Sequence, residues 1–137
     1  MASWSADLEL GNPSMDDDHK QLVMLVNELE YSVDHRRSSD VIRAQFEDLM
    51  TVADRHFCHE ERMMRQAGYP DFRGHKKLHD DLTRDLHTLM RQIASGEGEV
   101  SHTTIEWLKG WVGGHIRGED RKLAKFLAER PLLSRIA

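Results

Sequence analysis

The chain has 137 residues and a formal net charge of −5 at pH 7, from 19 Lys and Arg against 24 Asp and Glu. A chain of this length can bury a sizeable core as one domain, and its acidic balance argues against nucleic acid and anionic membranes as partners. Its one cysteine, Cys58, excludes an intramolecular disulfide, and no apolar run approaches the roughly 18 residues that a membrane span needs. We therefore expect a cytoplasmic protein with a single domain over residues 1–137, of which about 1–14 form an N-terminal arm.

Apolar residues recur at intervals of three and four in four long stretches, whereas the period-two alternation typical of strands is missing. This pattern predicts helices over about residues 15–37, 40–67 and 71–94, and a fourth that follows Ser101 as its N-cap and reaches Ile116. A short helical tail is expected over 119–129, before Pro131. Because the connecting loops are short, neighbouring helices should be antiparallel. The predicted fold class is all-α: an up-down-up-down four-helix bundle with a short C-terminal helical extension.

Six polar side chains occupy positions that the apolar pattern assigns to the core of the bundle. A single buried histidine is usually a hydrogen-bonded core residue, but an unsatisfied imidazole or carboxylate there costs several kcal/mol. His56 with Glu60, and His75 with His79, are spaced four residues apart, so each pair projects from one face of its helix. Imidazole and carboxylate together suit a transition metal in a bundle core. The candidate ligands on the predicted seams are His19, His56, Glu60, His75, His79 and His115.

The other histidines and the cysteine serve as internal comparisons. His35 and His102 point about 140–160° away from the predicted seams and should face solvent. His87 lies about 80° from its seam and is expected to be a structural residue. His59 flanks the seam of its helix and stays open as a weaker alternative ligand. Cys58 projects to the opposite side, so we expect it to be neither ligand nor nucleophile.

The order and spacing of these residues resemble the hemerythrin family, in particular its bacterial single-domain members. The resemblance covers nearly the whole chain, and its motifs are His19, then His56-x3-Glu60, His75-x3-His79 and His115-x4-Asp120. It implies a non-haem di-iron centre that binds dioxygen reversibly, in an oxygen carrier, store or delivery protein that is not an enzyme. The iron with fewer histidines would keep an open position for dioxygen. The implied ligands are His75, His79 and His115 for one iron, His19 and His56 for the other, and Glu60 and Asp120 as bridges beside an oxo or hydroxo group.

Next to the open position, the resemblance implies an apolar wall that keeps water away from bound dioxygen. Val112 departs from the leucine that family members commonly carry at this position, so dioxygen access or the stability of the adduct is expected to change. Ordinary core packing is compatible with the same side chains. The implied wall residues are Phe57, Trp111, Val112 and Ile116.

Other functions remain open. A module that senses oxygen, nitric oxide or iron would use the same centre, and the ligands alone do not exclude it. A di-iron oxidase of the ferritin-like kind is less favoured, because that class uses about four carboxylates and two histidines in Glu-x2-His pairs. A zinc hydrolase is disfavoured by the lack of a His-Glu-x2-His motif and by too many ligands for one tetrahedral ion. The partners we expect are dioxygen and an unidentified oxygen-consuming enzyme.

The last carboxylate poses a conflict between local geometry and the resemblance. On a regular helix Glu119, four residues after His115, would share its face, whereas Asp120 would point about 140° away. A single wide turn with i to i+5 spacing would bring Asp120 back, and Gly113 and Gly118 make this segment permissive. We therefore predict a bulge or break over residues 116–119, with Asp120 as the bridging carboxylate and Glu119 turned toward solvent.

Overall fold

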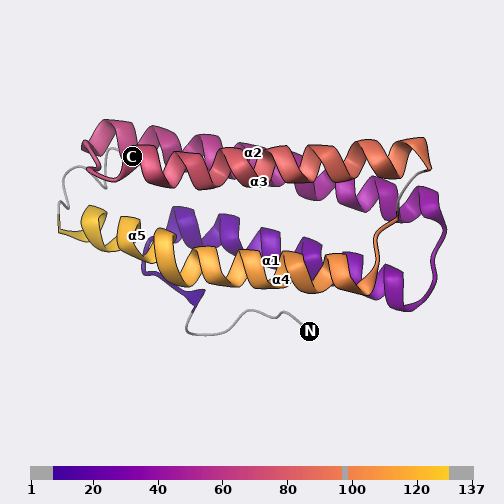
Figure 1. Ribbon diagram of the computed structural model, residues 1–137. Helices are drawn as coiled ribbons and strands as arrows, with labels where there is room; N and C mark the ends of the chain where they lie inside the picture. The colour runs from indigo at the N-terminus through magenta and orange to yellow at the C-terminus, as the bar shows by residue number, and fades with distance from the viewer. Residues whose placement is uncertain (1–7, 97–98, 130–137) are drawn as a thin grey trace.

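A computed structural model describes residues 8–96 and 99–129 and places them in a bundle of four long helices (Figure 1). A short π-helical turn, η2 (Ile116–Asp120), joins the fourth helix to a short C-terminal helix. No strand occurs within the described ranges, so the predicted all-α class and the four-helix bundle are confirmed. The helices are α1 (Pro13–Asp34), α2 (Ser39–Ala67), α3 (Phe72–Ser95), α4 (His102–His115) and α5 (Arg121–Ala128).

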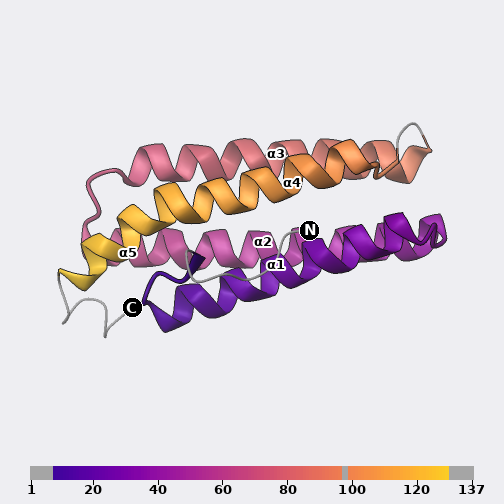
Figure 2. The same cartoon turned by 90° about the horizontal axis from the view of Figure 1, so that it is seen from below.

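The four long helices are antiparallel neighbours in two layers of two. Helix α1 packs against α2 and α4, and α2 packs against α3. Figure 1 shows the α2 and α3 layer above the α1 and α4 layer, and the view from below in Figure 2 shows α3 beside α4. The short α5 continues the line of α4 beyond η2. Each long helix therefore presents one face to a common axis. No helix of the described residues is both long enough and apolar enough to cross a bilayer.

The helix ends follow local capping rules. Asn12, Ser38 and Ser101 each accept a backbone N–H of the following helix, as N-cap residues do. Helix α1 ends at Asp34 instead of the predicted position near 37, because Arg36 adopts a left-handed φ of 52° and stops the regular hydrogen bonding. The other predicted bounds agree to within about two residues.

Residues before α1 are tied to its first turn. The carboxylate of Asp16 accepts the N–H groups of Leu10 and Gly11 at 2.9 and 3.1 Å. Of the predicted N-terminal arm, residues 1–7 lie outside the described residues, and α1 itself begins at Pro13, inside the predicted range.

The apolar core is divided in two by a polar layer. One cluster fills the middle of the bundle and includes Leu22, Phe57 and Leu82. A smaller cluster at the α5 end includes Met63 and Leu123. Along the chain, the carboxylates Glu60 and Asp120 follow residues of the larger cluster and precede residues of the smaller one. The bundle thus surrounds its polar residues with apolar side chains on both sides.

Candidate metal centre

Seven buried polar side chains converge in the layer between the two apolar clusters. Helix α1 supplies one of them, α2 and α3 supply two each, and α4 and η2 supply one each. All are at most 8% exposed, so bulk water cannot supply their hydrogen bonds. The structure brings together all seven ligands expected from the sequence: His19, His56, Glu60, His75, His79, His115 and Asp120.

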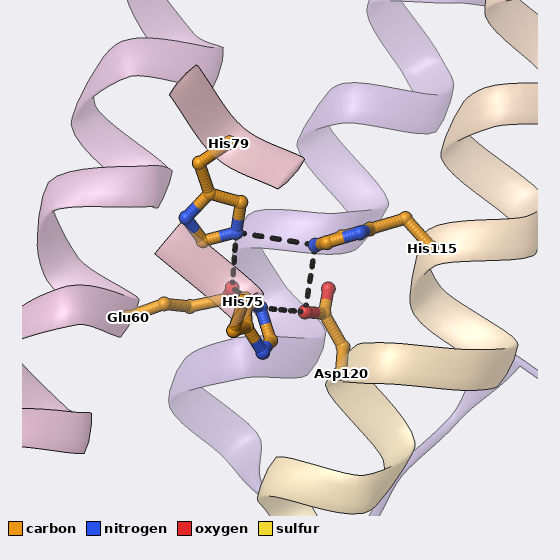
Figure 3. Close-up of side chains that lie close together, drawn as sticks. All are labelled: Glu60, His75, His79, His115 and Asp120. Carbon is orange, nitrogen blue, oxygen red and sulfur yellow. Dashed lines mark hydrogen bonds and ion pairs between the residues drawn. The ribbon is translucent and has the colours of Figure 1, made fainter. Parts of the chain in front are cut away.

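Three imidazoles form one side of the cluster, here called the three-histidine set: His75, His79 and His115 (Figure 3). The Nε2 of His75 lies 3.2 Å from Oε1 of Glu60 and 3.0 Å from Oδ1 of Asp120. The Nε2 of His79 lies 3.1 Å from the same Glu60 oxygen, and that of His115 lies 3.1 Å from the same Asp120 oxygen. The two latter Nε2 atoms are 3.1 Å apart. All three rings thus aim the same nitrogen at one small volume.

The other side, the two-histidine set, consists of His19 and His56 and uses the opposite carboxylate oxygens. The Nε2 of His19 lies 2.9 Å from Oδ2 of Asp120 and 3.4 Å from Oε2 of Glu60. The Nε2 of His56 lies 2.8 Å from Oε2 of Glu60 and 4.0 Å from Oδ2 of Asp120. Each carboxylate therefore turns one oxygen toward each set. This division is what two carboxylates need in order to span two metal ions.

The residues fit a pair of metal ions. Several of the converging atoms are fully buried and close to one another without making a hydrogen bond: Oε2 of Glu60, both carboxylate oxygens of Asp120, and Nε2 of His19 and of His56. Buried polar atoms without partners are costly, and cations are what such electron pairs bind. Two overlapping groups of candidate ligand atoms, each within 4.8 Å, share both carboxylates. Imidazole with carboxylate is a donor set for transition metals, not for calcium or magnesium.

A widened helical turn brings Asp120 into the site. Residues 116–120 form η2, so Asp120 is fully buried and faces His115 five positions earlier. The side chain of Glu119 is 27% exposed and lies 3.5 Å from Lys122 on the outer surface. The predicted bulge is confirmed, and it resolves the conflict between regular helical geometry and the motif in favour of Asp120.

Two carboxylates behind the cluster were not anticipated from the sequence. The Nδ1–H of His56 donates to Oδ2 of Asp18 at 2.9 Å, and the Nδ1–H of His79 donates to Oε2 of Glu61 at 3.1 Å. Metal-bound histidines commonly donate their second ring N–H to a carboxylate, which fixes the tautomer and the ring orientation. Each acid is next to a candidate ligand in the sequence, since Asp18 precedes His19 and Glu61 follows Glu60. Adjacency alone does not indicate these contacts, because each acid binds a histidine of another helix.

The weaker alternative ligand His59 lies outside both groups of converging atoms in the described chain. Its Nδ1–H donates to Asp18 at 3.0 Å, and its Nε2 lies 3.2 Å from Oγ of Ser14. His35 and His102 are exposed, as their helical positions predict. His87, expected to be a structural residue, is exposed too, and so is Cys58.

The cluster is electrostatically coupled. Burial and Asp120 oppose ionisation of Glu60, but His56 and His19 outweigh them and hold its pKa well below the usual range. Burial likewise raises the pKa of Asp120, yet His115 and His19 bring it well below normal. Burial lowers the pKa of His75, whereas the facing carboxylates raise it to about 9. Both carboxylates are therefore ionised, and without a metal they raise the pKa values of His19 and His56 as well, against the effect of burial.

Aromatic rings cover the imidazoles on the side of the larger apolar cluster. Phe57 stacks on His79 with ring centroids 4.1 Å apart, and Trp111 stacks on His115 at 4.6 Å. The ring centroid of Phe57 also lies 5.9 Å from that of His56, so Phe57 is near both histidine sets. A small apolar cavity of about 20 Å³ begins here. It is lined by Leu22, Leu49, Ala53, Phe57, Leu82, Leu86, Leu108, Trp111 and Val112.

Of the four expected wall residues, Phe57, Trp111 and Val112 therefore line the cavity. Ile116 is 2% exposed and packs in the same apolar cluster, but it is not among the lining residues.

Known proteins are similar to this chain in sequence and fold over most of its length. A bacteriohemerythrin of Pseudomonas aeruginosa (strain LESB58) is 32% identical over 120 residues, which are 85% of this chain and 75% of that protein. One from Methylococcus capsulatus (strain ATCC 33009 / NCIMB 11132 / Bath) is 32% identical over 106 residues, 77% of this chain and 80% of that protein. A crystal structure of wild-type hemerythrin superposes with a TM-score of 0.85 at 31% identity, covering 91% of this chain and 96% of that one. The model of the hemerythrin HHE cation binding domain matches residues 10–127, and the chain belongs to the hemerythrin family.

Proposed function

We propose that this chain binds dioxygen reversibly at a pair of iron ions and acts as an oxygen carrier, store or delivery protein, not as an enzyme. The observation that carries the proposal is the unequal division of five imidazoles between two metal positions that share two carboxylates. Two iron ions held in this way supply reversible two-electron binding of dioxygen when they are bound. The recipient of delivered dioxygen would be an oxygen-consuming enzyme.

The protein side chains create the difference between the two positions. The three-histidine set and the carboxylate oxygens Oε1 of Glu60 and Oδ1 of Asp120 surround one position closely. The two-histidine set, with Oε2 and Oδ2 of the same carboxylates, offers one nitrogen ligand fewer. Room for a small ligand is therefore expected at the two-histidine position.

Apolar side chains exclude water from the same region. Phe57 stacks on His79 and lies near His56, and Trp111 stacks on His115. Val112 borders the small apolar cavity behind these rings. A low local dielectric makes charge separation costly, so it favours return of the neutral dioxygen molecule over escape of a reduced anion. These side chains thus support reversibility, while the histidines and carboxylates support binding.

The numbers of histidine and carboxylate ligands disfavour a ferritin-like oxidase. That class builds its centre from about four carboxylates and two histidines. Here the converging groups contain five histidines and two carboxylates. Fewer anionic ligands stabilise the oxidised metal less, which favours release of dioxygen over repeated oxidation of a substrate.

An optical cycle tests the proposal. Purified protein loaded with ferrous iron under nitrogen is recorded, exposed to air, recorded again, and then returned to nitrogen. We expect a visible charge-transfer band that appears in air and disappears on deoxygenation with the iron still bound. A band that persists after deoxygenation, or continuous oxidation of added ferrous iron, would refute reversible binding.

A further inference from the structure

Asp18, on α1 directly before His19, ties together two histidines of α2. The Nδ1–H groups of His56 and His59 both donate to its Oδ2, over 2.9 and 3.0 Å. The Nε2 of His59 in turn lies 3.2 Å from the Oγ of Ser14 on α1. These contacts form a cross-link between α1 and α2, here called the Asp18 clasp, that reaches from the partly exposed edge of the bundle to a candidate metal ligand.

The clasp fixes which ring nitrogen of each histidine carries a proton. A carboxylate only accepts hydrogen bonds, so both rings must present Nδ1–H to Asp18. In His56 this leaves the electron pair of Nε2 directed at Glu60 and the centre. In His59 the Nε2 accepts a hydrogen bond from the hydroxyl of Ser14, and the ring of His59 thereby holds Asp18 in place.

The candidate histidine ligands differ in whether the Nδ1 atom, which points away from the centre, has a hydrogen-bond partner. The Nδ1 atoms of His19 and His75 are both buried, and neither has a hydrogen-bond partner among the described residues. His79 is the counterpart of His56, because its Nδ1–H donates to Glu61. One imidazole on each side is therefore held by a carboxylate, and the two carboxylates belong to different metal positions.

We propose that Asp18 is a positioning residue for the two-histidine metal position, which it controls separately from the three-histidine position. The inference rests on the proposed function only in requiring that both positions bind a metal. Asp18 acts through His56, whose rotation and tautomer it fixes. Its negative charge also makes that imidazole a stronger donor, and this stabilises the oxidised state of the metal. Since α1 supplies both Asp18 and His19, both imidazoles of this position depend on α1.

Four variants separate these effects. Asp18→Ala removes the clasp, whereas Asp18→Asn keeps an acceptor oxygen for His56 and removes the charge. Glu61→Gln makes the corresponding change at the other position. Asp17→Asn is the matched control, because Asp17 is the adjacent acid of α1 and is exposed. Circular dichroism of each metal-free variant establishes that the bundle is folded.

Stepwise Co²⁺ titration, followed by visible absorption of the bound metal, measures the affinity of each position. Loss of an outer carboxylate partner typically costs about 10–100-fold in metal affinity. We expect Asp18→Ala to weaken one of the two Co²⁺ equivalents by that amount and to leave the other nearly unchanged. Asp18→Asn should weaken the same equivalent less, Glu61→Gln should weaken the other equivalent, and Asp17→Asn should match the wild type.

The reduction potential of the bound iron distinguishes loss of the Asp18 charge from a loss of folding. In the iron-loaded protein, Asp18→Asn should raise the reduction potential, because the oxidised metal loses an anion behind His56, while the fold is retained. Equal loss of both Co²⁺ equivalents in Asp18→Ala, no loss in either, or an unchanged potential in Asp18→Asn would each overturn the inference. If the wild type itself binds only one Co²⁺, the proposed function fails first, so the two failures are distinguishable.

Discussion

Removal of Asp120 should be far more damaging to metal binding than removal of its neighbour Glu119. The two oxygens of Asp120 lie 2.9–3.1 Å from His19, His75 and His115, so Asp120→Ala should take one candidate ligand from each proposed metal position. Loss of a direct ligand should exceed the roughly 10–100-fold cost of losing an outer partner, which is more than about 1.4–2.8 kcal/mol per ion. Asp120→Ala should therefore purify with almost no iron.

Glu119→Ala removes only a surface contact. Its carboxylate is partly exposed and lies 3.5 Å from Lys122, and such pairs contribute about 0.2–1 kcal/mol. If α4 continued as a regular helix, residue 120 would be rotated away from the face of His115. Its Cα would then lie about 4 Å from the place that the wide turn gives it. Iron content by plasma mass spectrometry, before and after a chelator challenge, distinguishes the two variants. Iron retained in Asp120→Ala and lost in Glu119→Ala would show that Glu119 is the ligand and that the wide turn is misassigned.

Four further outcomes are expected. Reconstitution should give two irons per chain, and a single iron or zinc would contradict the ligand count. Val112→Leu should fill the adjacent cavity and lengthen the lifetime of the oxygenated form, and Val112→Ala should shorten it; equal autoxidation rates would place Val112 outside the pocket. Deletion of Gly118 should preserve iron binding, because Asp120 then follows His115 by four residues on a regular helix; loss of iron in a folded variant would refute this. In metal-free protein the pKa of His75 is raised to about 9, so its stabilisation is complete below about pH 6.5 and is lost toward pH 9. The Tm should fall across that range, and a rise would contradict the sign.

The repeat of apolar residues was sufficient to predict the helices because each one buries a single face. The same repeat also indicated the candidate ligands, since His56 and Glu60 interrupt an apolar seam at positions where a polar group needs a partner. The position of Asp120 required the motif as well, because helical periodicity alone selects Glu119. The wide turn then reconciled the two, and η2 lies where that reasoning placed it.

Other features depend on contacts between helices that no local pattern encodes. Asp18, for example, accepts hydrogen bonds from two histidines of α2. Which rings approach that carboxylate depends on the register between α1 and α2, and periodicity does not determine this register. The early end of α1 likewise depends on the left-handed conformation of Arg36, which a non-glycine residue seldom adopts.

We expect two irons, held by unequal numbers of histidines, to bind one dioxygen molecule and release it unchanged. The most direct test measures the oxygen uptake and the iron content of the same sample over repeated cycles of oxygenation and deoxygenation. One dioxygen molecule should bind per two irons and be recovered as dioxygen in each cycle. Uptake without recovery, or uptake that varies independently of the iron pair, would contradict it.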